Sequence, residues 1–114
     1  MLEMKGSGYR VWFEPASATV HMEGTLRLNT GEYAPLTALL NEVIATGTAA
    51  LTLHVRELVF LNSSGINTLY KFALALRKRG GVKLTVLTKK DVSWQSRSLP
   101  NLQRFYAEVE FEAL

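Results

Sequence analysis

The chain has 114 residues, 47% of them hydrophobic and 20% charged, with a net charge of +3, which predicts a single soluble domain over residues 1–114. It has no cysteine, which excludes disulfides, thiolate nucleophiles and cysteine-ligated metal sites. No apolar run reaches the roughly 18 residues that span a bilayer, and the N-terminus lacks the apolar segment of a signal peptide. We therefore expect a cytoplasmic protein without membrane insertion.

The first predicted elements are two strands that form a hairpin. Residues 9–13 mix aromatic side chains with valine and stop at Pro15, which favours an edge strand. Residues 18–23 alternate weakly between apolar and polar side chains and end at Gly24. The short link between the two runs predicts antiparallel pairing.

A helix follows, after a connector over residues 25–31. Pro35 is compatible only with its first turn, and Gly47 predicts its end. The apolar residues recur at the i, i+3, i+4 and i+7 spacing of one helical face. They are Tyr33, Leu36, Leu39, Leu40, Val43 and Ile44.

The middle of the chain predicts a strand, a helix and a strand. Residues 51–55 alternate between apolar and polar side chains, and this strand runs on toward residues 58–61. The next helix carries an apolar stripe and ends in three cations and two glycines, a usual stop signal. Residues 82–86 form the following strand, and this order predicts a right-handed parallel crossover.

The last part of the chain predicts a turn or short helix with Trp94, a helix over about residues 101–107, and a short strand over residues 109–111. Trp94 could be an exposed anchor for a partner, but we favour packing beneath the last helix. The complete order predicts an α/β fold with a mixed central sheet of about five strands. Three to four helices flank that sheet on one main face.

The most distinctive motif lies where residues 58–61 lead into the second helix, in the run Asn62-Ser63-Ser64-Gly65-Ile66. At a helix N-terminus, free backbone N–H groups and the positive end of the helix dipole point outward. A phosphoryl group on a serine there would gain hydrogen bonds and add about −1.5 to −2 charges. This chemistry suits a switch better than a catalyst.

Each residue of this motif also has a plain structural interpretation. Ser63 is favoured over Ser64 as a phosphoacceptor, but Ser63 could instead be the N-cap and Ser64 a helix-start hydroxyl. Gly65 either lets a partner backbone approach closely or eases a tight turn.

The order of elements over about residues 9–112, the segment Gly24-Thr25-Leu26 and the motif Leu61 to Ile66 resemble the STAS domain, the fold of bacterial anti-sigma-factor antagonists. In phosphorylatable members the motif reads Asp-Ser-Ser-Gly followed by an aliphatic residue, and a partner anti-sigma kinase phosphorylates its first serine. The resemblance thus implies a non-enzymatic regulator with Ser63 as phosphoacceptor, whose kinase and phosphatase are separate proteins. It also implies a partner-binding turn made of Asn62, Ser63, Ser64, Gly65 and Ile66.

One position departs from the family pattern, because the aspartate of the motif is Asn62 here. Asparagine still caps a helix, but it has no charge to pair with a cation on a kinase. The family also includes members without a working phosphosite. The departure favours a second hypothesis, a STAS-like scaffold or transporter-accessory subunit that binds its partner constitutively.

Other chemistry has little support in the sequence. His21 and His54 are single histidines on predicted strands, without metal-ligating neighbours in sequence, so no metal is expected. A small hydrolase that uses Ser63 is a third hypothesis, although the turn is not a Gly-x-Ser-x-Gly elbow and no acid is evident. No glycine-rich phosphate loop is present, so no nucleotide or other cofactor is expected.

The charge is unevenly placed along the chain. Residues 1–57 carry 4 lysines and arginines against 6 acids, a net of −2, whereas residues 58–114 carry 9 against 4, a net of +5. Such an excess can attract an acidic partner or nucleic acid. Lys71 and the run Arg77-Lys78-Arg79 are more simply a solvated helix end, and no nucleic-acid partner is expected.

Overall fold

The computed structural model describes residues 2–114. Its strands are β1 (Glu3–Gly6), β2 (Tyr9–Glu14), β3 (Thr19–Leu26), β4 (Ala50–His54), β5 (Leu58–Leu61), β6 (Lys83–Thr88) and β7 (Glu110–Ala113). Its α-helices are α1 (Ala34–Ala45), α2 (Ser63–Arg79), α3 (Ser93–Ser98) and α4 (Leu102–Phe105). Short 3-10 turns are η1 (Pro15–Ser17), η2 (Thr30–Tyr33) and η3 (Leu99–Asn101).

The strands form one mixed sheet in the order β1, β2, β3, β4, β6, β7, with β5 also paired to β3. The neighbours β1, β2 and β3 are antiparallel, so the predicted hairpin is confirmed. The pairs β3–β4, β3–β5, β4–β6 and β6–β7 are parallel. The predicted α/β class and the parallel arrangement of β4 and β6 around α2 are therefore confirmed.

The sheet differs from its predicted form in two places. It has seven strands among the described residues rather than about five, because residues 3–6 pair with β2 and because β5 is separate from β4. The prediction that residues 9–13 form an edge strand is wrong, since β1 lies outside β2. Only Met4 of β1 is buried, which leaves no alternation to recognise in the sequence. β5 is separate because the chain turns after β4, where Leu58 N–H donates to the Val55 carbonyl at 2.9 Å.

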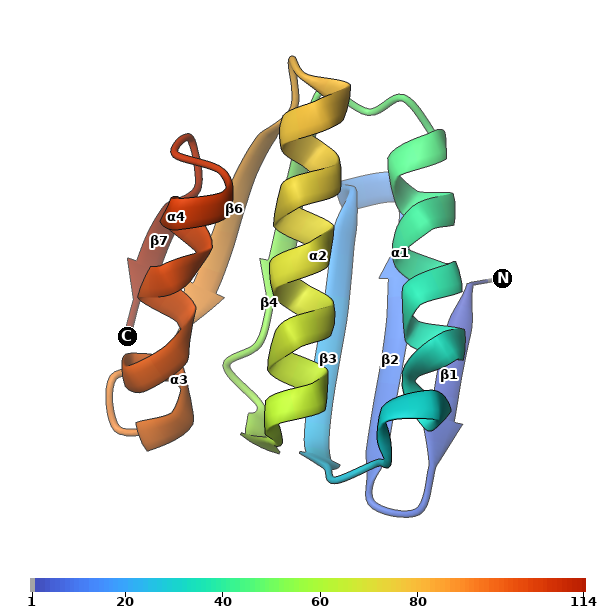
Figure 1. The fold of residues 1–114 in the computed structure, drawn as a ribbon, viewed down its shortest axis with the longest axis vertical. Coiled ribbons are helices and arrows are strands. Elements are labelled where there is room, and N and C mark those ends of the chain that lie inside the picture. The colour runs from blue at the N-terminus through green and yellow to red at the C-terminus, as the bar shows by residue number, and fades with distance from the viewer. Residues whose placement is uncertain (1) are drawn as a thin grey trace.

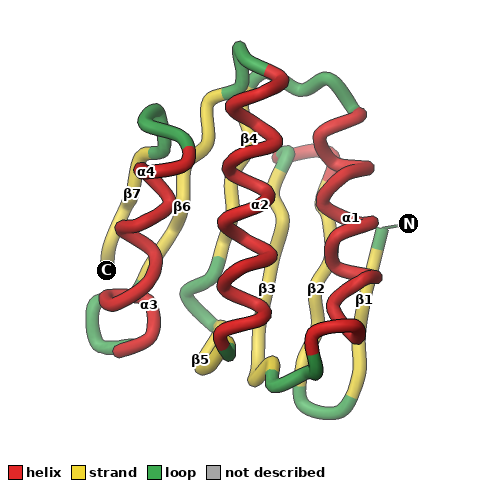
Figure 2. Tube along the Cα trace, viewed as in Figure 1, coloured by secondary structure: helices red, strands yellow, loops and turns green. Residues whose placement is uncertain are grey.

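The helices lie on one face of the sheet, as the order of elements predicts (Figure 1). Figure 2 shows α1 and α2 side by side in front of the central strands, with α3 in front of the β6–β7 side. The core lies between these layers, where Leu40 of α1 and Leu76 of α2 are buried with Leu53 of β4. Each such leucine contributes about 1.5–3 kcal/mol by leaving water.

The ends of the two long helices follow the sequence signals. Pro35 lies in the first turn of α1, and Gly47, just beyond its end, has φ 75°. At the end of α2 the basic last turn is followed by Gly80 with φ 72°. Positive φ values of this kind carry no steric penalty in glycine, so both predicted stops are confirmed.

The predicted helix over residues 101–107 is shorter than expected. The chain forms η3 and then α4, and it leaves the helix at Tyr106, which is extended with φ −152° and ψ 101°. The buried Tyr106 hydroxyl donates to the Val82 carbonyl at the start of β6. This anchor redirects the chain into β7.

Candidate functional site

Asn62 holds the turn from β5 into α2 in shape. It is the N-cap of α2, because its Oδ1 accepts from Gly65 N–H at 3.2 Å. The same oxygen accepts from the Tyr33 hydroxyl at 2.6 Å, and Nδ2 donates to the Leu28 carbonyl at 2.8 Å. A side chain that accepts two hydrogen bonds and donates one must be an amide here, because an ionised aspartate cannot donate. Asparagine in place of the aspartate of the motif therefore stabilises the turn through the bond that its Nδ2 donates.

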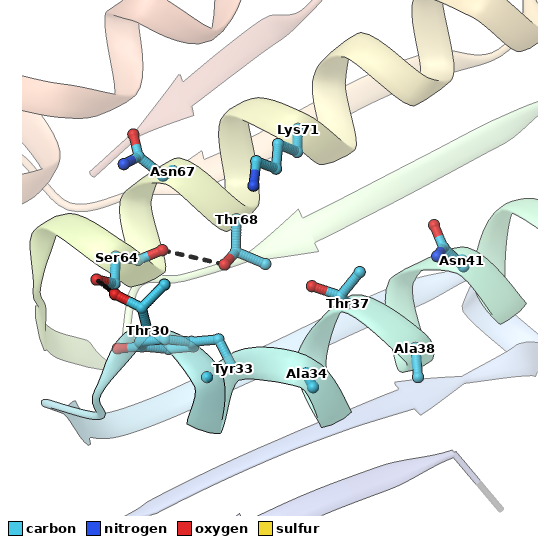
Figure 3. Close-up of a pocket in the computed structure, with 11 residues that line it drawn as sticks. Thr30, Tyr33, Ala34, Thr37, Ala38, Asn41, Ser64, Asn67, Thr68 and Lys71 are labelled. Atoms are coloured by element: carbon cyan, nitrogen blue, oxygen red, sulfur yellow. Dashed lines mark hydrogen bonds between the residues drawn. The ribbon is translucent and has the colours of Figure 1, made fainter.

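The two serines of the turn have different surroundings. Ser63 is the first residue of α2 and is exposed. Ser64 is half-buried, its Oγ lies 2.9 Å from Oγ1 of Thr30, and its carbonyl accepts from the Thr68 hydroxyl at 3.0 Å (Figure 3). Because Asn62 is the cap, the interpretation of Ser63 as N-cap is wrong. The exposed hydroxyl of the pair belongs to Ser63.

Gly65 is required by close packing inside the turn. It is buried, and a Cβ at this position would lie 2.3 Å from Leu61 Cδ1 and 2.8 Å from the Tyr33 hydroxyl oxygen. Real Cβ atoms do not approach other atoms so closely. The glycine lets the first turn of α2 lie directly against β5 and the end of η2, a reason that the sequence interpretations did not include.

Tyr33 is a site residue that sequence reasoning assigned only to the core stripe. Its ring is buried, with 2% exposure, and its hydroxyl lies 2.6 Å from Asn62 Oδ1 and 3.3 Å from the Leu26 carbonyl. Burial raises the pKa of Tyr33, against a smaller opposing effect of the Leu28 N–H. The phenol therefore stays protonated at neutral pH and ties the entry of α1 to the cap of α2.

A groove of about 470 Å³ opens beside this turn, between α1 and α2 (Figure 3). Ser64 lines it, whereas Ser63 is not among its lining residues. Its polar lining consists mostly of hydroxyl and amide side chains, together with one lysine. These residues include Thr30, Thr37, Asn41, Asn67 and Lys71. The sequence does not reveal the groove, because these residues come from η2, α1 and α2 and only packing brings them together.

Trp94 packs inside the protein rather than serving as an exposed anchor. Its side chain is 5% exposed, and its indole Nε1–H donates to the Leu58 carbonyl at 2.8 Å. Gln95 beside it is also buried and donates to the carbonyls of Val55 and Leu58. Together these two side chains donate hydrogen bonds to one carbonyl at the start of β5 and one in the turn before it.

The basic run of α2 lies far from the candidate turn. Arg77, Lys78 and Arg79 occupy the last turn of the helix and are exposed, at the end opposite to Ser63 (Figure 1). Lys71 is also exposed but lies at the groove. The position of the run fits the solvated helix end that the sequence indicates.

The histidines do not lie with the serine. His21 and His54 face one another across β3 and β4, with their Nδ1 atoms 3.1 Å apart, and neither is a groove residue. Within residues 2–114 there is no group of three or more histidine, aspartate or glutamate side chains placed to hold a metal ion. The arrangement lacks the serine–histidine contact that the hydrolase hypothesis needs.

A search of the described helices finds none with both the length and the apolar character needed to cross a membrane. The longest, α2, has 17 residues and carries a basic last turn.

No family model matches the chain, and no curated protein matches its sequence. Its structure is similar to a chain in the crystal structure of diguanylate cyclase SiaD in complex with its activator SiaC from Pseudomonas aeruginosa, with TM-score 0.74 and 16% identity over 100% of both chains. It is also similar to SiaC of the same organism, with TM-score 0.69 and 17% identity over 98% of this chain and 97% of that one. The crystal structure of apo-SiaC gives TM-score 0.61 and 16% identity over 96% and 93%. At these identities the likeness shows the fold, and the chain has the fold of SiaC along its whole described length.

Proposed function

We propose that this chain is a single-domain, non-enzymatic regulatory binding module of the cytoplasm, of the STAS type found in anti-sigma-factor antagonists. Its turn of Asn62, Ser63, Ser64, Gly65 and Ile66 docks against a protein partner, an anti-sigma kinase. That kinase phosphorylates Ser63, which releases the partner, and a separate phosphatase restores binding. The main observation behind this proposal is that Ser63, the first residue of α2, is exposed. The hydrogen bonds of the Asn62 side chain fix the backbone around it.

The residues of the turn divide into a contact surface and its support. Ser63 is exposed and Ile66, one turn further along α2, is partly exposed, so these two meet a partner. Asn62 and Gly65 fix the backbone of the turn. The two contact residues are uncharged and Ile66 is apolar, a composition that the centre of a protein interface commonly has.

Phosphorylation would change this surface more than any other single modification of the turn. A phosphoryl group on Ser63 adds about −1.5 to −2 charges where none of the five turn residues is charged. Docking would then require that charge to be desolvated, which costs several kcal/mol when no cation compensates. A loss of only about 2.7 kcal/mol weakens binding about 100-fold.

The similar structures support a regulatory role for this fold. SiaC is described as the activator of diguanylate cyclase SiaD and forms a complex with it. A chain of the same fold can thus act by binding an enzyme. In the present chain, the proposed binding surface is the Ser63 turn.

The test is a pull-down from lysate of the native cells, read by mass spectrometry, with the unmodified protein, Ser63→Glu and Ser63→Gln as baits. Glutamine matches glutamate in size but has no charge. The switch predicts that the wild type and Ser63→Gln hold the same histidine-kinase-like ATPase and that Ser63→Glu loses it. Phosphate on Ser63 in protein isolated from those cells would be an independent confirmation.

The alternative is a STAS-like scaffold or transporter-accessory subunit that binds constitutively. It is favoured by Asn62, whose amide serves the cap network in place of the charge found in the phosphorylatable motif. If Ser63→Glu holds the same partner as the wild type, and no phosphate is found on Ser63 in the native protein, the switch is excluded and this alternative stands.

A further inference from the structure

A row of register partners crosses the face of the sheet opposite to the helices. Val20 and Met22, the neighbours of His21 along β3, are buried in the core, so His21 points to the other face. Figure 1 shows the helices on the core side only. From β1 to β7 the successive partners are Glu3, Trp12, His21, His54, Leu87 and Glu112.

The two histidines at the centre of this row are hydrogen-bonded to one another. Their Nδ1 atoms lie 3.1 Å apart, although the residues are 33 positions apart in sequence. The rings meet edge to face, with centroids 5.2 Å apart. A hydrogen bond between two imidazole nitrogens needs a proton on one and a free lone pair on the other. The pair can therefore be neutral or singly protonated, but a second proton removes the bond and sets two positive charges against each other.

Two side chains of β2 lie against the His21 ring. The Trp12 ring stacks on His21 with centroids 4.8 Å apart, so its π face lies against the imidazole. Glu14 Oε1 lies 3.4 Å from His21 Nε2, on the side of the ring away from His54. The guanidinium of Arg10, also on β2, lies over Trp12, 4.0 Å from the ring centroid.

His54 favours its neutral form. Burial lowers the pKa of His54, and the charges of His21 and Arg56 lower it further, against smaller opposing effects of Glu57 and Glu23. The register partner of His54 on β6 is Leu87, which has no charge to offer. Burial and the charges of His21 and Arg56 thus outweigh the two carboxylates, and the neutral form of His54 is favoured.

The pair also occupies a junction in the sheet. The register between β3 and β4 covers only residues 19–21 and 52–54, and His21–His54 is its last pair. Beyond it, β3 pairs with β5 from Gly24 onward, with a shift in register between Gly24 and Thr25. β5 leads directly into the Ser63 turn. Loss of the histidine contact would weaken the β3–β4 ladder at its last pair, beside this transition.

We propose that the His21–His54 pair is a proton-responsive clamp between β3 and β4, which stays closed while one of the two Nδ1 atoms keeps a free lone pair and opens when both are protonated. The direction of the pH effect follows from the lowered pKa of His54, which favours the neutral form in the folded chain. The clamp contributes its full stability above the ordinary range of imidazole titration. That contribution is lost as the pH falls through this range toward the lower folded value.

The test compares the wild type with His54→Gln, a neutral variant that keeps a polar side chain at the junction. Thr52→Gln, on the same face of β4, is the matched control. Urea unfolding is measured at about pH 8 and about pH 5, a range in which histidine titrates. The unfolding constant of the wild type and of Thr52→Gln should rise with acid more than that of His54→Gln. This additional rise in the unfolding constant is about tenfold for each unit by which folding lowers the pKa of His54.

Histidine titration by NMR on the folded wild type gives a second readout that does not depend on any variant. The clamp predicts two steps separated by more than about one pH unit. Two steps that coincide would overturn the proposal. It would equally be overturned if His54→Gln lost as much stability on acidification as the wild type.

Discussion

The cap network at Asn62 makes a sharp prediction for Asn62→Asp, the substitution that restores the acidic residue of the phosphorylatable motif. The introduced carboxylate keeps the bonds from Gly65 N–H and the Tyr33 hydroxyl, but it cannot donate to the Leu28 carbonyl, which Asn62 Nδ2 reaches at 2.8 Å. Losing that donor costs about 1–3 kcal/mol. A negative charge at the start of α2 returns about 0.3–1 kcal/mol.

We therefore expect Asn62→Asp to destabilise the protein by about 1–2 kcal/mol at neutral pH, from the difference of these two contributions. The melting temperature should fall by about 4–8 °C, at about 4 °C per kcal/mol for a domain of this size. Asn62→Ala removes all three bonds and should cost about 2–3 kcal/mol. The expected order of stability is wild type, then Asn62→Asp, then Asn62→Ala.

Thermal and urea unfolding followed by circular dichroism measure this order. Acid supplies an internal control, because a protonated carboxyl group can donate and the deficit of Asn62→Asp should shrink below about pH 4. If Asn62→Asp is as stable as the wild type at neutral pH, the bond from Nδ2 to the Leu28 carbonyl does not contribute, and the structural account of Asn62 is wrong.

Two further substitutions test the packing around the candidate site. Gly65→Ala should cost about 1–3 kcal/mol in urea unfolding, because its Cβ meets Leu61 and the Tyr33 hydroxyl. Gly31→Ala, which has open space, should change stability by less than about 1 kcal/mol, and equal losses for the two would contradict the packing argument. Trp94→Phe should lower stability by about 2 kcal/mol through the lost indole volume and hydrogen bond. An unchanged unfolding midpoint for that variant would refute the buried role of the indole.

Local patterns were sufficient for the larger elements of the fold. The 3.6-residue spacing of apolar side chains predicted α1 and α2, and alternation predicted β3, β4 and β6, because each of these segments buries one face against the same core. The aromatic and valine content of residues 9–13 predicted β2. The turn at Ser63 was also found, since a strand, hydroxyl residues and an amphipathic helix follow one another directly. The short segments β1 and β5 were missed as separate strands, because each has four residues and too few buried positions to form a pattern.

The class of fold and the place of the candidate turn thus follow from local sequence, since both depend on neighbouring residues. The contacts that hold the turn in shape come from the packing of distant segments. Asn62 meets Leu28 across 34 positions, and Ser64 meets Thr30 across the same separation. His21 and His54 likewise meet because β3 and β4 pair in one particular register. Contacts of this kind depend on which strands pair and on how helices pack, and the apolar pattern of one segment does not identify its partner segment.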